Sequence, residues 1–276
     1  MWVSDKHKAL YCNVPKVACS NWKKVLYLMN SMDNHESHVN RSFMYNVIHD
    51  PHIHRNIDGA PWRLMHMSPE DIIHRLNTYT SFIVVRRPYS RVLSAYREKF
   101  QSKHLLLIWR YWMYRIYVYL KLGIARVGNR HDRRQSFANW RHQNKNVTSY
   151  FFMPYGYTST FPEFVKFATE PDIKYDFSGD QHWMPIIDIC RPCQVRYDII
   201  AKLETMDTDA RFILKRFGVP ELFDVVAAVP SHETNSSAED VQKSYYSTLS
   251  ARDIARFQQK YKKDFEYFGY DSELAL

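Results

Sequence analysis

A lysine, Lys16, lies in a short break between an apolar run and a helical pattern near the start of the chain. The run, residues 9–14, has the length and the β-branched or aromatic content of a buried strand, and Pro15 ends it. From about Ser20, apolar residues recur at three- and four-residue spacing, which predicts a helix. The free N–H groups and positive dipole end of such a helix favour an anion, and Lys16 adds a full charge. The pattern therefore indicates an anion-binding turn, and an ordinary strand–turn–helix that carries a lysine is the alternative.

A second basic turn follows a second apolar run. Residues 82–85 resemble a strand, Arg86 and Arg87 follow it, and Pro88 suits the first turn of a helix, where its missing N–H costs nothing. Ser94 lies two helical turns further on. Ligands bind at the carboxyl ends of strands in open α/β sheets. Two strand–turn–helix units with cationic turns therefore indicate one ligand with two separated anionic groups.

These stretches resemble the donor-binding segments of the Golgi carbohydrate sulfotransferases. Residues 14–23 (VPKVACSNWK) are similar to the 5′-phosphosulfate loop of that family, and residues 85–100 (VRRPYSRVLSAYREKF) are similar to its 3′-phosphate segment. Residues 182–210 resemble the HW…C-x-P-C…YD…K-x-E-T segment of the branch that contains the chondroitin and dermatan 4-O-sulfotransferases and the HNK-1 sulfotransferase. Residues 245–270 resemble the usual ending of that branch, whereas the middle of the chain, residues 101–161, matches poorly.

The resemblance implies an α/β fold of the P-loop-like, three-layer kind, with a central parallel sheet flanked by helices. It implies a single catalytic domain over residues 1–276. The expected donor is 3′-phosphoadenosine 5′-phosphosulfate (PAPS), a co-substrate, and no metal is expected. The expected acceptor is a glycosaminoglycan or glycoprotein glycan, with the GalNAc 4-O position of chondroitin or dermatan as the target. The alternatives are an HNK-1-type glucuronyl 3-O-sulfotransferase and a protein that binds sulfated glycans without catalysis.

Carried over residue by residue, the resemblance assigns the donor contacts. Lys16 would touch the bridging and 5′-phosphate oxygens and stabilise the leaving group, because transfer of this kind depends on positioning and on neutralising charge. Arg86 and Ser94 match the 3′-phosphate ligands. The complete predicted donor-binding set is Pro15, Lys16, Val17, Ala18, Cys19, Ser20, Asn21, Trp22, Lys23, Arg86 and Ser94.

A sugar hydroxyl is a poor nucleophile at neutral pH, so a general base is expected. His38 is the leading candidate, since it lies in a stretch similar to the family's E-x-H-V and histidine titrates in the right range. Glu36 and His182 are the alternatives. Lys202 and Glu204, from K-x-E-T, are predicted to form an ion pair that supports the site.

The four cysteines leave several interpretations open. Cys190 and Cys193 form a C-x-x-C pattern that suits a redox motif, half a zinc site or a tight disulfide, and no second C-x-x-C completes a zinc site. The family context favours a structural disulfide between them. Cys12 and Cys19 flank the anion-binding turn and are expected to be buried free thiols. The histidine-rich stretch, residues 31–63, repeats no known spacing of metal ligands.

The charge balance narrows the class of partner. Among 276 residues, 38 Lys and Arg against 29 Asp and Glu give a net charge of +9 and a pI near 9.2, which favours polyanionic partners. A nucleic-acid-binding protein would share this charge, but no recognised basic helix or stacking motif is present. A P-loop kinase would need the glycines of the Walker loop, which the first turn lacks.

The hydropathy pattern bears on localisation. No run of eighteen apolar residues occurs, and the nearest candidate, residues 104–124, is interrupted by basic residues and reads as an amphipathic helix. The resemblance nevertheless implies a type II Golgi membrane protein with a luminal catalytic part, so the membrane anchor is expected upstream of Met1.

Overall fold

The computed structural model describes most of the chain, in two compact units built from interleaved segments. The first unit draws on residues 1–91, 185–233 and 263–270, and the second on residues 92–184, 234–262 and 271–276. The single catalytic domain expected from the sequence stays a prediction. The described residues are 1–31, 45–47, 62–101, 113, 116–117, 120, 158–170, 180–227 and 234–274.

A four-stranded sheet in the order β1-β2-β3-β4 forms the centre of the first unit, counted over the described residues. The strands β2, β3 and β4 pair in parallel, and β1 adds an antiparallel edge. Strand β2 lies within its predicted run, and β3 begins two residues before the predicted run 82–85, whereas β1, only three residues long, is too short for a periodic pattern to show. The strand bounds are β1 Trp2–Ser4, β2 Ala9–Cys12, β3 Thr80–Val85 and β4 Ile199–Lys202.

A helix follows each parallel strand closely. Helix α1 (Cys19–Ser31) comes after β2, and α5 (Pro88–Phe100) comes after β3 with Pro88 as its first residue, as predicted. Helix α10 (Met206–Arg216) follows β4 through the 3₁₀ turn η2 (Leu203–Thr205). The carboxyl ends of β2 and β3 therefore lead into the two basic turns, which is the arrangement that the sequence predicts.

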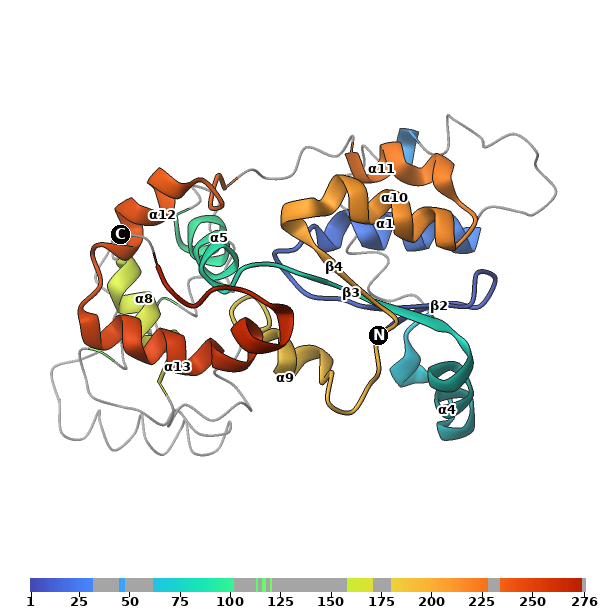
Figure 1. Ribbon diagram of the computed structural model, residues 1–276, viewed down its shortest axis with the longest axis horizontal. Helices are drawn as coiled ribbons and strands as arrows, with labels where there is room; N and C mark the ends of the chain where they lie inside the picture. The colour runs from blue at the N-terminus through green and yellow to red at the C-terminus, as the bar shows by residue number, and fades with distance from the viewer. Residues whose placement is uncertain are drawn as a thin grey trace, which may run out of the picture. The chain divides into compact units, whose positions relative to one another are not determined.

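The two faces of the sheet are covered by different helices. Figure 1 shows α1, α10 and α11 (Phe223–Ala227) on one side of the sheet, and α4 (Pro69–Thr78) and α9 (Ile186–Cys190) on the other. Ser68 caps α4, because its side chain accepts a hydrogen bond from the Asp71 N–H at 3.1 Å. Two further 3₁₀ turns complete the unit, η1 (Leu64–His66) and η3 (Pro220–Leu222). These layers confirm the predicted α/β class, with a mostly parallel sheet flanked by helices.

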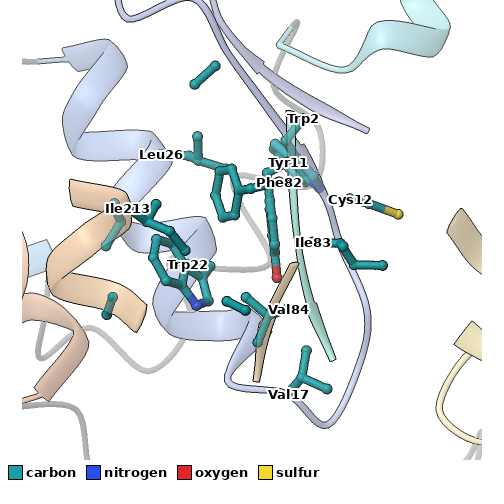
Figure 2. Close-up of a cluster of buried hydrophobic side chains, with 14 of the residues drawn as sticks. Trp2, Tyr11, Cys12, Val17, Trp22, Leu26, Phe82, Ile83, Val84 and Ile213 are labelled. Carbon is teal, nitrogen blue, oxygen red and sulfur yellow. The ribbon is translucent and has the colours of Figure 1, made fainter. Parts of the chain in front are cut away.

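Alternation along the strands sends neighbouring side chains to opposite faces. Tyr11 and Phe82 are paired in register and stack at 4.9 Å between ring centroids, and Trp22 of α1 packs edge-on against Phe82 at 5.1 Å. Figure 2 shows these rings on the α1 side, while Cys12 and Ile83 point the other way. Burying three aromatic rings of this size, each worth about 2–3 kcal/mol, anchors α1 firmly on the sheet.

The second unit has an aromatic core of its own. Tyr96 of α5 packs against Phe161 and Phe164 of α8, and Phe164 meets Trp183 edge-on. Tyr261 is fully buried and donates a hydrogen bond to the Trp183 carbonyl. The helices that lie wholly or largely in this unit are α8 (Phe161–Ala168), α12 (Glu239–Tyr246) and α13 (Ala251–Phe268).

Candidate functional site

The turn between β2 and α1 has an unusual backbone. Lys16 and Ala18 adopt positive φ angles of 71° and 62°, a left-handed conformation that favours glycine. Each such residue costs about 1–2 kcal/mol for a side chain with a Cβ atom. Backbone of this kind persists where the surroundings enforce it, commonly at ligand clamps. The turn therefore reaches without glycine the tight curvature for which phosphate loops use glycine.

The amino terminus of α1 opens directly from this turn. The Ala18 carbonyl accepts the N–H groups of Asn21 and Trp22 at 3.0 and 3.2 Å, so the helix is wound from its first residues. The N–H groups at the start of an α-helix have no partner inside it, and no acidic residue occupies the first turn of α1. Lys16, half-buried, lies three residues before the helix begins. The arrangement suits an anion.

Two buried arginines, Arg86 of the second basic turn and Arg91 of α5, hold the first turn in place. Arg86 Nη1 donates to the Lys16 carbonyl at 3.1 Å, and Arg91 Nε donates to the Pro15 carbonyl at 3.1 Å. Arg86 is 7% exposed and Arg91 1% exposed. Hydrogen bonds from charged donors are worth about 1.5–3 kcal/mol, more than neutral ones. Sequence reasoning assigned Arg86 to the ligand only and did not find Arg91, because nothing local indicates that either side chain reaches back to another turn.

The burial of Arg86 changes its acidity. The pKa of Arg86 is lowered to about 10, mainly by loss of solvation; the nearby Glu204 raises this pKa, and the neighbouring Arg91 lowers it. The guanidinium is still protonated at neutral pH. A cation that has already lost its water is well placed to bind a phosphate, since less solvation remains to be removed.

Glu204 supports the second turn, although not through the predicted ion pair. Its carboxylate accepts the Arg87 N–H at 2.8 Å and the Tyr270 hydroxyl at 2.9 Å. Lys202 instead donates to the Gly269 carbonyl at 3.4 Å and lies 4.6 Å from the centroid of the Tyr270 ring. The prediction of a Lys202–Glu204 ion pair is wrong, because the strand directs Lys202 toward the end of α13 while Glu204 turns back to the basic turn.

The cysteine pairing also differs from the prediction. Cys12, the last residue of β2, forms a disulfide with Cys190, the last residue of α9, across 178 residues of sequence and 6.0 Å between Cα atoms. Cys193 is an exposed free thiol and Cys19 a partly buried one. The expected Cys190–Cys193 bond and the free Cys12 thiol are therefore wrong. Cys12 points to the α9 face of the sheet (Figure 2), so the tertiary fold selects a partner that proximity in sequence does not.

The comparisons with known proteins identify the family. Residues 1–271 match the sequence model of the sulfotransferase family. The chain belongs to the sulfotransferase family. It is 31% identical to carbohydrate sulfotransferase 10 of Xenopus laevis, over 98% of this chain and 67% of that protein. It is also 31% identical to carbohydrate sulfotransferase 14 of Danio rerio, over 97% of this chain and 61% of that protein.

Human carbohydrate sulfotransferase 10 is similar to the same extent, at 31% identity over 98% of this chain and 66% of that protein. The chain thus spans about two thirds, or slightly less, of the length of these relatives. No solved structure matches this chain significantly. The match confirms the predicted family, and the named relatives support the predicted class of enzyme, a PAPS-dependent carbohydrate O-sulfotransferase.

Several predicted donor residues take part in the architecture of the turn. Trp22 is fully buried, its backbone N–H donates to the Ala18 carbonyl, and its ring packs against Tyr11 and Phe82 in the core. Lys23 is 7% exposed, and its ammonium group lies 5.6 Å from the centroid of the Trp2 ring. This cation–π contact places Lys23 against the edge strand β1.

Ser94, the second predicted 3′-phosphate ligand of the sulfotransferase, belongs to the second unit. It is 3% exposed, and its hydroxyl accepts a hydrogen bond from Thr234 Oγ1 at 3.0 Å. Thr234 is in turn 2.8 Å from Ser236 Oγ. The sequence does not indicate this group of hydroxyls, because 140 residues separate Thr234 from Ser94.

Of the three candidates for the general base, the structure describes only His182. His38 and Glu36 lie outside the described residues. His182 bonds to the Asp180 carboxylate through its ring Nδ1, and the backbone N–H of His182 donates to the same carboxylate at 2.9 Å. Burial raises the pKa of Asp180, but the hydrogen bonds and charge of His182 outweigh it and leave that pKa below its usual value. Beside the buried Trp183, this pair has the character of a structural contact.

Two further observations concern metals and membranes. Among the described residues, no three or more histidine, cysteine or acidic side chains gather in a group that could hold a metal ion. In the same part of the chain, no helix is both long and apolar enough to cross a bilayer.

Proposed function

We propose that this chain transfers the sulfuryl group of PAPS to a sugar hydroxyl, with the GalNAc 4-O position of chondroitin or dermatan as the target. The observation that supports it most is the first turn, at the start of α1. Lys16 and Ala18 are left-handed there, and the carbonyls of Lys16 and Pro15 accept hydrogen bonds from Arg86 and Arg91. In a chain of the sulfotransferase family, an anion cradle at this place suits the 5′-phosphosulfate of the donor.

The proposed mechanism assigns the chemistry to charge placement. The acceptor hydroxyl attacks sulfur in line, the S–O bond to the 5′-phosphate breaks, and the electron pair stays on the departing phosphate. Lys16 and the N–H groups of the turn neutralise that developing charge. Arg86 and Ser94 would each bind the 3′-phosphate. His38 would take the proton of the sugar hydroxyl, with Glu36 or His182 as the alternatives.

The location and the acceptor are proposed on the resemblance stated above. The protein would act in the Golgi lumen as a type II membrane protein. An HNK-1-type glucuronyl 3-O-sulfotransferase is the alternative within the same chemistry. A protein that binds sulfated glycans without transferring sulfate is the alternative outside it.

Donor selectivity is the experiment that tests the proposal. The thermal unfolding of the purified chain is measured with 3′-phosphoadenosine 5′-phosphate and with ADP, for the wild type, Arg86→Ala and the exposed-arginine control Arg211→Ala. A ligand at a hundred times its Kd stabilises a protein by about 2.7 kcal/mol. We expect this stabilisation with the 3′-phosphorylated nucleotide only, reduced in Arg86→Ala and retained in Arg211→Ala.

Transfer assays then identify the acceptor. Desulfated chondroitin, desulfated dermatan and a glucuronyl-terminated glycan are each offered with labelled PAPS. Label on the GalNAc 4-hydroxyl supports the proposed target, and label on the glucuronyl 3-hydroxyl supports the alternative. Equal stabilisation by ADP in a folded sample, with no transfer to any acceptor, contradicts a sulfotransferase activity.

A further inference from the structure

A hollow with a volume of about 520 Å³ lies in the first unit, at the end of the sheet opposite the first turn. It is bounded by the end of α4, the amino ends of β3 and β4, and the last turns of α10. Its lining includes Asn77, Ile200, Phe212 and Arg216. The volume falls within the range of about 300–1,000 Å³ that is usual for small-molecule sites.

The apolar part of the hollow is exposed to solvent. Phe212 is 59% exposed and Ile200 48% exposed. Single exposed apolar residues are normal on a protein surface. Here, however, an aromatic ring and a branched aliphatic side chain line the same concave surface, and the ring offers a flat apolar face to a ligand.

The polar part of the hollow provides a cation and an amide that the fold does not use. Within the described residues, Arg216 has no ion pair and no side-chain hydrogen bond, and Asn77 has no side-chain hydrogen bond either. Asp198, also in the lining, is already engaged, because it accepts the Ser81 N–H at 2.8 Å and the Ser81 hydroxyl at 3.1 Å. An acidic group would therefore find one available guanidinium, in a lining that also holds the Asp198 carboxylate, whose Oδ2 bonds to Ser81.

The dipole of α10 explains only in part why Arg216 lies at the hollow. Arg216 lies in the last turn of α10, where a cation interacts favourably with the helix dipole. Lys215, its neighbour, already supplies a charge there and lies outside the lining of the hollow. The dipole explains a cation at the end of the helix, but it does not explain why one of two cations lies with an exposed aromatic ring and an amide.

We infer that this hollow binds an acidic sugar of the acceptor glycan, remote from the point of transfer. The apolar C–H face of the pyranose packs on Phe212, and its carboxylate accepts a bidentate pair of hydrogen bonds from Arg216. Asn77 bonds to the hydroxyls. The net charge of +9 favours such a polyanion over a neutral chain. This inference rests on the proposed function, since it names a second contact for the same acceptor.

The position of the hollow determines which acceptors can use it. Strand β3 has six residues and leads from the hollow toward the basic turns, a length of roughly 20 Å at about 3.3 Å per residue. A polymer can engage both places at once, whereas a disaccharide can occupy only one. Linked binding of this kind raises the overall affinity well beyond that of either contact alone.

Kinetics with two acceptor lengths test the inference. The variants are Arg216→Gln and Phe212→Ser, and the matched control is Lys215→Gln, which removes the same charge from the neighbouring position. With desulfated chondroitin polymer, we expect about a tenfold higher KM in both hollow variants and an unchanged kcat. With a disaccharide acceptor, neither constant should change. An unchanged polymer KM, or an equal rise in Lys215→Gln, overturns the inference.

Direct binding separates this inference from the proposed function. Desulfated chondroitin octasaccharide is titrated into wild type and Arg216→Gln by calorimetry without donor, alongside the same octasaccharide with its carboxylates reduced to alcohols. Loss of binding in Arg216→Gln and with the reduced sugar supports the hollow even if no sulfate transfer is found. Transfer by a protein whose octasaccharide binding is unaffected by Arg216→Gln retains the proposed function and overturns the hollow.

Discussion

The two strand–turn–helix segments look alike in sequence, yet they play different parts in the structure. The turn after β2 presents strained backbone, with Lys16 and Ala18 both left-handed, at the start of α1. The turn after β3 sends Arg86 back to the first turn, and Arg91 of α5 does the same. One segment forms the cradle and the other holds it in shape. The comparison teaches that a basic residue near an anion site can act on the protein's own carbonyls as well as on the ligand.

The largest effect is expected at the cradle itself. Lys16→Ala should lower kcat by about 10²–10³-fold, the usual cost of removing one donor that stabilises developing charge. The thermal midpoint should change little, because the side chain is half-buried and the backbone conformation is kept. Steady-state sulfate transfer and a melting curve measure both. A kcat close to that of wild type would show that the turn's N–H groups suffice without Lys16.

The Cys12–Cys190 disulfide anchors β2, the strand that leads into the Lys16 turn. Its removal should therefore have the next largest effect. Cys190→Ser should lower the free energy of unfolding by about 2–5 kcal/mol, the range for loss of a native disulfide. Cys193→Ser, the matched control three residues away, should leave it unchanged, since Cys193 is exposed and unbonded. Denaturant unfolding of both variants decides between them. Destabilisation by Cys193→Ser as well would contradict the Cys12–Cys190 disulfide and support the Cys190–Cys193 bond that the sequence suggests.

The holding arginine should matter for stability more than for chemistry. Arg91→Leu leaves the Pro15 carbonyl without its donor and should cost about 3 kcal/mol, as expected for a buried polar group that loses a charged partner. Arg91→Lys should recover only part of this, because an ammonium lacks the planar geometry of a guanidinium. Chemical denaturation measures both. If Arg91→Leu were as stable as wild type, the carbonyl contact would contribute nothing to the shape of the turn.

The smallest effect concerns the strain in the cradle. Ala18→Gly relieves a left-handed conformation worth about 1–2 kcal/mol and increases the freedom of the unfolded chain by about 0.4–1 kcal/mol, so stability should be unchanged or slightly higher. Ala255→Gly, at an exposed position inside α13, should destabilise by about 0.5–1 kcal/mol. Opposite signs in the two unfolding experiments would confirm the strain. A similar loss in both variants would contradict it.

Local sequence patterns predicted several of the strands and helices near the candidate site. The strands β2 and β3, the helices α1 and α5, and the proline at the start of α5 were predicted, because periodicity and turn residues act over a few positions. The family was evident from ordered blocks such as residues 14–23 and 85–100, which follow the paired strands β2 and β3. These features depend on neighbours in the chain, so the sequence alone determined them.

The remaining features depend on contacts between distant residues. The partner of Cys12 is 178 residues away, Thr234 reaches Ser94 across 140, and Arg91 finds Pro15 across 76. Which of these contacts form is determined by the strand register and by the face to which each side chain points, and neither leaves a local pattern. The left-handed Lys16 and Ala18 belong with them, because a residue other than glycine adopts that conformation only when the packed surroundings enforce it. Only the tertiary structure decides such contacts, since each one needs two segments that the fold must first bring together.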